Sequence, residues 1–153
     1  MNSKPETILA DNVKALQHSV AWLQRSFDIC SKTGERQNLT PEEMDAYESL
    51  TARFARTANL LFNKVFRSLH YFLEGENRTW LDVLHYMEKT GVLKSMEEAR
   101  FLKELRNDIV HEYALNNVLE LFIEVYQQTP LLLTMVASAI AEAERVLAKA
   151  TKG

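Results

Sequence analysis

Residues 106–113 concentrate several reactive side chains at the end of a helical pattern, in the order Arg-Asn-Asp-Ile-Val-His-Glu-Tyr. The planar, permanently charged guanidinium of Arg106 suits the oxygens of a phosphate group. His111 carries the side chain that gains and loses a proton near neutral pH. Together they could assist attack of an RNA 2′-hydroxyl on the adjacent phosphorus. Asp108 and Glu112 are isolated carboxylates rather than a metal cage, so the predicted chemistry requires no metal ion.

Helical geometry limits how these side chains can cooperate. On an α-helix Arg106 and Tyr113 lie about 20° apart, and Asn107 shares a face with His111, but Arg106 and His111 diverge by about 140°. One straight helix therefore does not aim both groups at the same atom. Either the helix loosens before His111, or the site is assembled across the symmetry axis of a dimer.

The spacing Arg-x4-His is weak evidence by itself, because it arises often by chance. In the alternative interpretation Arg106 and Asp108 are solvated, while His111 and Tyr113 pack against the end of a helix. The two interpretations predict different surroundings for the same residues.

The arrangement Arg-x4-His-x-Tyr resembles the signature of the HEPN ribonuclease toxins, most closely their HepT branch. In that superfamily an arginine, a polar residue and, after a few variable positions, a histidine stand late in a helix of an α-helical bundle. Arg106, Asn107 and His111 match this motif, and Tyr113 matches the His-x-Tyr extension of the branch. The helical order of most of the chain is also similar, but the specific match is confined to residues 104–113.

The resemblance implies a metal-independent endoribonuclease toxin of a type II toxin–antitoxin system, acting on RNA as a homodimer without a cofactor. His111 would be the general acid and base, Arg106 the anchor of the transition-state phosphate, and Asn107 a supporting polar group. Members of the branch are typically paired with an MNT-type nucleotidyltransferase antitoxin, which can attach AMP to the motif tyrosine, here Tyr113. Such AMPylation would place anionic phosphates beside Arg106, where an RNA phosphate must bind.

A second interpretation comes from a different functional class. Non-catalytic HEPN-type proteins serve as binding subunits of a nucleotidyltransferase and need not keep both the arginine and the histidine. The intact Arg106, His111 and Tyr113 favour the toxin, whereas the acidic pI of about 5.8 favours the binding subunit.

The composition predicts the scaffold that must position this cluster. The chain has 153 residues, of which 46% are hydrophobic and 25% charged, with only four glycines and three prolines. So few turn formers favour helices over a many-stranded sheet. We therefore expect one all-α domain spanning residues 1–153, an up-and-down bundle of four long helices plus short ones.

The apolar periodicity places these helices along the chain. In residues 7–31 Leu9, Val13 and Leu16 begin a heptad seam that continues to Cys30, with Trp22 beside it. A capping box at Thr40 opens a helix over residues 40–72 that carries two apolar stripes, so this helix is central or also faces a partner subunit. Further helices are expected over residues 80–89, 97–113 and 118–129, with Phe101, Val118 and Leu119 facing the core and Pro130 restarting or kinking the last helix.

Four cations gather on one side of the helix over residues 40–72. Arg53, Arg56, Lys64 and Arg67 fall within about 80° of one another on an α-helix. They form either a solvated face that suits the helix dipole or a phosphate track towards the cluster, in contact with RNA or the antitoxin. Because the net charge is −3, any binding of nucleic acid must depend on such a local surface.

The remaining reactive residues predict structural roles. Cys30 is expected to be a buried core residue in a reducing compartment, and His70 and His85, which lack metal-ligand spacing, are expected at or near the surface. No apolar signal core is visible near Met1, and the longest apolar run, residues 130–141, is too short to span a bilayer. We therefore expect a cytoplasmic protein without a membrane segment.

Overall fold

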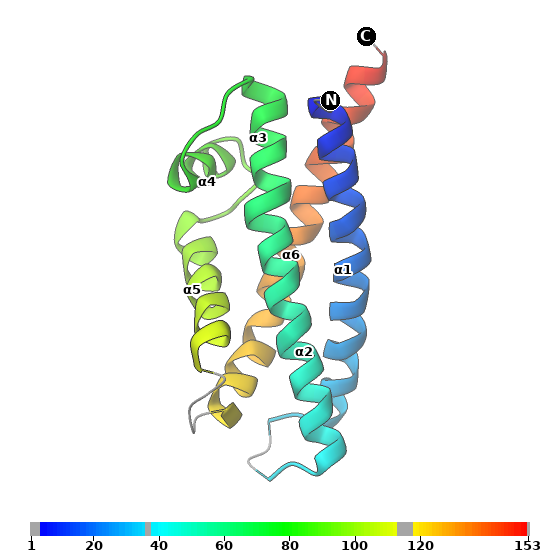
Figure 1. Ribbon diagram of the computed structural model, residues 1–153, viewed down its shortest axis with the longest axis vertical. Coiled ribbons are helices and arrows are strands. Elements are labelled where there is room, and N and C mark those ends of the chain that lie inside the picture. The colour runs from blue at the N-terminus through cyan, green and yellow to red at the C-terminus, as the bar shows by residue number, and fades with distance from the viewer. Residues whose placement is uncertain (1–3, 36–37, 113–117, 153) are drawn as a thin grey trace.

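The computed structural model describes residues 4–35, 38–112 and 118–152, and all regular elements within these ranges are helical. The all-α prediction is therefore confirmed for the described residues. Long helices run side by side along one axis, and a shorter one covers part of a flank (Figure 1). In chain order the elements are α1 (Pro5–Thr33), α2 (Pro41–Asn59), the π-helix η1 (Leu60–Val65), α3 (Phe66–Glu74), α4 (Trp80–Lys89), α5 (Met96–Glu112) and α6 (Val118–Lys152).

The helix α1 packs lengthwise along the bundle through the predicted heptad seam. Leu9, Leu16, Leu23 and Cys30 are completely buried, so the seam is confirmed. Trp22 does not widen this buried face, because 46% of its surface is exposed. The guanidinium of Arg53 in α2 instead lies over one face of its ring.

The elements α2, η1 and α3 form one continuous rod through the middle of the molecule. Its start is confirmed, because the Thr40 hydroxyl accepts a hydrogen bond from the Glu43 amide and the Glu43 carboxylate accepts one from the Thr40 amide. The π-helix was not predicted. In it the amide of Phe66 donates to the carbonyl of Leu61, five residues earlier, so the rod contains a locally wider turn.

Most of the second apolar stripe of this rod is buried within the same chain. Phe62, Phe66 and Leu69 are at most 2% exposed, whereas Leu73 at the end of the stripe is 40% exposed. The helix α4 covers the buried part, and the ring of Trp80 meets Phe62 edge-on at 6.2 Å between centroids. The rod is thus central, and its second stripe is open to solvent at Leu73.

The last helix runs through Pro130 without ending, so of the two predicted outcomes, a restart or a kink, the restart is wrong. Pro130 has no N–H to donate to the carbonyl one turn earlier, that of Tyr126. The hydroxyl of the preceding Thr129 donates to the carbonyl of Val125 at 2.7 Å. The start of α6 is also rotated from the prediction: Leu121 is buried and Leu119 is 37% exposed.

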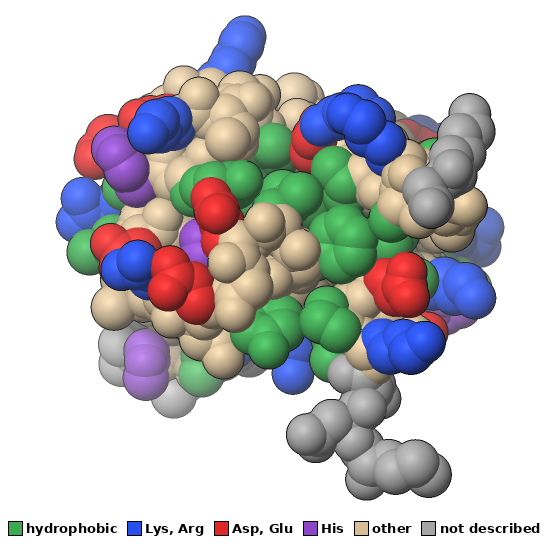
Figure 2. All heavy atoms as spheres, turned by 90° about the horizontal axis from the view of Figure 1, so that it is seen from above, with side chains coloured by type: hydrophobic (Ala, Val, Ile, Leu, Met, Phe, Trp, Pro, Cys, Tyr) green, Lys and Arg blue, Asp and Glu red, His purple; other side chains and the backbone are tan. Residues whose placement is uncertain are grey.

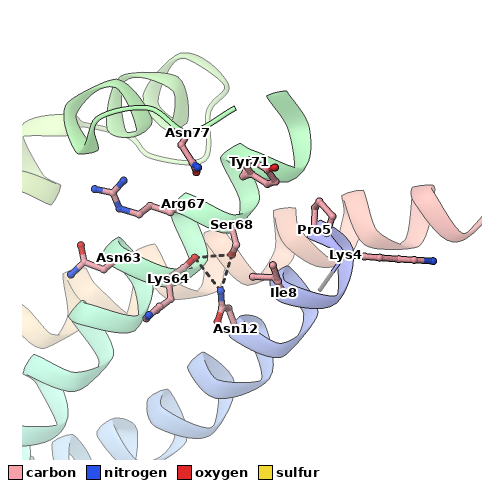
Figure 3. Close-up of a pocket in the computed structure, with 10 residues that line it drawn as sticks. All are labelled: Lys4, Pro5, Ile8, Asn12, Asn63, Lys64, Arg67, Ser68, Tyr71 and Asn77. Atoms are coloured by element: carbon pink, nitrogen blue, oxygen red, sulfur yellow. Dashed lines mark hydrogen bonds between the residues drawn. The ribbon is translucent and has the colours of Figure 1, made fainter. Parts of the chain in front are cut away.

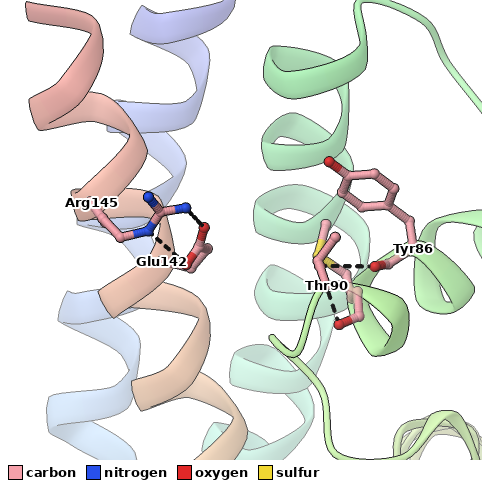
Figure 4. A network of polar contacts seen from close by, with 5 residues as sticks. Tyr86, Thr90, Glu142 and Arg145 are labelled. Atoms are coloured by element: carbon pink, nitrogen blue, oxygen red, sulfur yellow. Dashed lines mark hydrogen bonds and ion pairs between the residues drawn. The ribbon is translucent and has the colours of Figure 1, made fainter.

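A local hydrogen bond caps the end of α4, and an ion pair links two residues of α6. The Thr90 hydroxyl donates to the Tyr86 carbonyl at the end of α4, and Glu142 pairs with Arg145 on the neighbouring face of α6 (Figure 4). The hydrogen bond from Arg145 lowers the pKa of the Glu142 carboxyl. Each of these two contacts stabilises its own helix and does not join one helix to another.

The end of the bundle that carries the start of α1 and the end of α6 has an apolar centre. Seen from this end, hydrophobic side chains gather in the middle of the face and charged side chains lie around it (Figure 2). No helix in the described ranges is long and apolar enough to cross a membrane.

Candidate functional site

The helix that carries the candidate residues is α5, and its beginning is tied to α4. The amide of Met96 donates to the Glu88 carboxylate at 2.8 Å, and the hydroxyl of Ser95 accepts from the Glu98 amide at 3.4 Å. The helix then buries Ala99, Leu102, Leu105 and Ile109, spaced by three and four residues. Phe101 precedes this stripe and is 42% exposed, so its predicted inward position is wrong.

Arg106 lies half-buried on the flank of α5. Its Nη1 donates to the side-chain amide oxygen of Asn107 at 3.2 Å. Its Nε is enclosed and has no acceptor among the described residues. A guanidinium has five N–H donors, so most of them remain available to an anion. The arginine is thus held against the helix with unused donors.

His111 is exposed in the last turn of α5. The helix remains α-helical through Glu112, so it does not loosen before His111, and that alternative is excluded. Within one chain the directions of Arg106 and His111 therefore diverge by about 140°. Asn107 stands about 40° from His111 and one turn before it, and its hydrogen bond draws the guanidinium towards the histidine face.

Tyr113, the residue expected to receive AMP, lies outside the described residues. Asp108, beside the cluster, is exposed.

Lys103 and Trp80 are candidate functional residues that the sequence analysis did not single out. The Nζ atom of Lys103 lies 3.8 Å from the centroid of the Trp80 ring, a cation–π contact. Trp80 Nε1 is enclosed and has no hydrogen-bond partner among the described residues. Lys103 stands one turn before Arg106, and this spacing of two cations by three residues is the sequence pattern that could have pointed to it. The chain thus presents two neighbouring cations on one flank of α5.

The four cations of the central rod separate into two groups. Arg53 and Arg56 border a depression of about 220 Å³ with His18 and Trp22 of α1. Arg53 donates to the Ser26 hydroxyl at 2.7 Å, and its guanidinium carbon lies 4.9 Å from the centroid of the Trp22 ring.

Lys64 and Arg67 border a separate, larger groove against the start of α1. The π-helix begins after Arg56 and contains Lys64, so the second group starts within it. No residue of α5 lines either depression, and α1 and α5 lie on opposite flanks of the rod (Figure 1). Within one chain the four cations do not form a single track to Arg106.

The other reactive residues have structural surroundings. Cys30 is buried as predicted, and burial raises the pKa of its thiol to about 11. His85 is exposed, but His70 is buried and meets the ring of Tyr86 edge-on at 4.9 Å, so its predicted surface position is wrong. No group of three or more histidine, cysteine or acidic residues in the described ranges could hold a metal ion.

Comparison with known proteins gives no relative for this chain. No protein-family model matches it, and neither the curated proteins nor the solved structures contain a significant match.

Proposed function

We propose that this protein is a metal-independent endoribonuclease, the toxin of a type II toxin–antitoxin system, with Arg106, Asn107 and His111 as its site. The observation that carries the proposal is the hydrogen bond from Arg106 to Asn107, one turn before an exposed histidine. It supports the proposal because it orients a phosphate-binding cation at the end of α5 that also carries a group able to transfer protons at neutral pH.

In the proposed reaction neutral His111 accepts the proton of an RNA 2′-hydroxyl, whose oxygen attacks the adjacent phosphorus. Arg106 donates hydrogen bonds to the nonbridging oxygens as negative charge accumulates on them. The bond from phosphorus to the 5′-oxygen breaks, and a histidinium returns a proton to that oxygen. The products are a 2′,3′-cyclic phosphate and a 5′-hydroxyl, with no net change in protons.

A homodimer would complete this site. In one chain Arg106 and His111 diverge on a continuous helix, so His111 of a second subunit would supply proton transfer opposite Arg106. Val110, adjacent to His111, is 58% exposed and offers an apolar contact for that subunit. A dimer axis beside the last turn of α5 would place Arg106 opposite His111 of the second subunit and would cover Val110.

The proposed inhibitor is an MNT-type nucleotidyltransferase acting on Tyr113. Transfer of AMP to this tyrosine would place a phosphate near Arg106, in competition with the RNA backbone. Mass spectrometry of the protein after coexpression with such a partner would detect the added AMP. Neutralisation with Tyr113 unmodified would leave simple binding as the inhibitory mechanism.

The decisive experiment measures cleavage of RNA by single variants with matched controls. His111→Ala should lower kcat about 100-fold or more, the usual contribution of a general acid or base. Arg106→Ala should lower it about 100-fold, because it removes stabilisation of the transition-state charge. The matched controls are His85→Ala and Arg100→Ala, exposed residues of α4 and α5 that should leave kcat unchanged. If all four variants and the wild type were equally inactive, and Tyr113 carried no modification, the proposal would be wrong.

The second candidate is a non-catalytic HEPN-type subunit of a nucleotidyltransferase. The observation that favours it is the divergence of Arg106 and His111 on an uninterrupted helix, together with the net charge of −3. This candidate predicts tight binding to the nucleotidyltransferase and no RNA cleavage by any form of the protein. Binding should then be the same for the wild type and for His111→Ala.

A further inference from the structure

A polar groove lies between the start of α1 and the rod formed by η1 and α3. It has a volume of about 760 Å³, within the range of sites that take small molecules or segments of polymers. None of its lining residues is acidic, although the chain contains 21 aspartates and glutamates. They are Lys4, Pro5, Ile8, Asn12, Asn63, Lys64, Arg67, Ser68, Tyr71 and Asn77.

The groove is held by direct contacts between α1 and the rod. The Asn12 side chain donates to the Ser68 hydroxyl at 3.1 Å and to the Lys64 carbonyl at 3.4 Å. Ser68 in turn donates to the Lys64 carbonyl at 2.7 Å. Asn12 and Ser68 therefore form a connected floor between the two elements (Figure 3). The groove is preorganised.

Two of the groove's cations come from neighbouring turns of the rod, Lys64 from η1 and Arg67 from α3. Figure 3 shows Asn63, Lys64 and Arg67 extending to the same side of the rod, whereas Lys4 extends away from them. Arg67 is oriented by a hydrogen bond of 3.2 Å to the carbonyl of Arg78. Neither Lys64 nor Arg67 forms an ion pair within the described ranges, so both charges face solvent without a carboxylate partner.

We propose that this groove binds a single-stranded RNA. Lys64 and Arg67 supply charges for the phosphates, and the Asn63 and Asn77 amides offer both donors and acceptors to base edges. The ring of Tyr71 gives a surface on which a base can stack. An acidic peptide would also pair with the cations, but it lacks the flat bases that the Tyr71 ring can stack against. The combination of groups favours a nucleic acid.

The groove is separate from the candidate catalytic site. Figure 1 places the start of α1 at one end of the bundle and the last turn of α5 towards the other end. Binding of RNA in the groove does not depend on the ribonuclease activity, and each can be wrong while the other is right. A binding experiment in a variant without His111 separates them.

The test uses the full chain with His111→Ala, so that bound RNA cannot be cut, and follows fluorescence anisotropy of a labelled single-stranded oligoribonucleotide. Lys64→Ala with Arg67→Ala should weaken binding about 10-fold or more. The plot of log K against log salt should become shallower by about 1.4, because each lost contact with a single strand contributes about 0.7. Tyr71→Leu should weaken binding about 5-fold through lost stacking, with the salt slope unchanged.

The matched control is Lys14→Ala with Lys94→Ala, which removes the same charge from exposed positions outside both depressions. Binding within about twofold of the parent is expected for this control, and circular dichroism checks that each variant is folded. Equal weakening by the two pairs would overturn the proposal in favour of a general charge effect. Displacement by polyglutamate as effective as by unlabelled RNA would overturn it in favour of an acidic partner. Equally tight binding of AMP would overturn it in favour of a free nucleotide.

Discussion

At the scale of single residues, Asn107 decides how the candidate site can work. Helix geometry separates Arg106 from His111 of the same subunit. The hydrogen bond to the side-chain amide oxygen of Asn107 holds the guanidinium in one orientation, towards which His111 of a second subunit would point in the proposed dimer. Without this contact the guanidinium would gain rotational freedom in solvent. Asn107 is therefore a positioning residue, acting through Arg106 rather than on the substrate.

Replacing Asn107 should reduce cleavage without changing proton transfer. Asn107→Ala removes a hydrogen bond to a charged group, and we expect kcat/KM for RNA to fall about 10-fold, near the lower limit for such bonds. The pH dependence of the reaction should be unchanged, because His111 is retained. A cleavage assay across pH measures both quantities.

Asn107→Asp gives the matched comparison for this position. It keeps the acceptor oxygen but adds a negative charge beside Arg106, so it should lower kcat/KM further than alanine does. Wild-type activity in both variants would show that the orientation of Arg106 is irrelevant to cleavage.

Tyr47 makes the fold sensitive to alkaline pH. Its buried phenol donates to the Gly34 carbonyl at 2.6 Å, and burial above all, with nearby Cys30 as a further cause, raises the pKa of Tyr47 from 10.0 to about 12. The folded protein therefore keeps a proton that the unfolded chain releases. The free energy of unfolding should fall as pH rises from 10 to 12.

Urea unfolding at a series of pH values tests this expectation. Tyr47→Phe should be less stable by about 1 kcal/mol near neutral pH and should show a shallower fall between pH 10 and 12. Cys30→Ala is the comparison, because burial raises its thiol pKa from 9.0 to about 11 and its contribution fades in an earlier window. Its removal should lower the pKa of Tyr47 only slightly, since burial is the larger cause of that shift. An identical fall in the wild type and Tyr47→Phe would exclude Tyr47 as the cause.

At the scale of elements, the least expected feature is the π-helix in the central rod. A π-turn behaves as one residue added to an α-helix, and it allows the helical faces before and after it to keep their own partners. Here α2 and α3 both pack on α1, and α2 also packs on α5 while α3 packs on α4. The π-helix also provides Asn63 and Lys64 to the groove.

Deleting one residue from the π-helix should be tolerated better than deleting one from the neighbouring α-helix. Removal of Asn63 would convert η1 to a regular turn and keep the faces of α2 and α3 in register. Removal of exposed Arg56 would rotate one part of the rod by about 100° against the other and misalign its buried stripe. We expect losses of about 2 kcal/mol or less for the first and more than about 4 kcal/mol for the second. Chemical unfolding of the two variants measures the difference, and equal losses would contradict this account of η1.

The features that were predicted correctly from the sequence are those that depend on a few neighbouring residues. The seam from Leu9 to Cys30 and the capping box at Thr40 are local, and both are found as predicted. The π-helix was missed because its wider turn depends on packing against several elements, and no residue type marks it. Likewise Pro130 predicts a break from its local chemistry, and its place within the continuous helix α6 became visible only in the structure. The types of the candidate site residues were readable from the sequence, whereas the contact between Arg106 and Asn107 required coordinates.

At the scale of the whole molecule, an acidic protein carries its cations in separate places. The net charge is −3, yet the groove beside η1 is lined without any carboxylate, and Lys103 and Arg106 lie together on α5. Electrostatic attraction of RNA to the whole molecule is therefore weak, and binding must come from these local surfaces. The two surfaces lie apart within one chain, so the proposed binding groove and the proposed catalytic site can be tested separately.

Mixing two inactive variants tests whether the catalytic site is shared between subunits. In the proposed dimer Arg106 of one subunit acts with His111 of the other. Arg106→Ala and His111→Ala homodimers should each be inactive, but random exchange makes about half of the dimers mixed. A mixed dimer has one site with both mutations and one intact site, so the mixture should recover about a quarter of wild-type activity. If each site were formed within one subunit, every site would lack one group and the mixture would remain inactive. An RNA cleavage assay before and after exchange therefore distinguishes the two arrangements, with size-exclusion chromatography confirming that both variants are dimers.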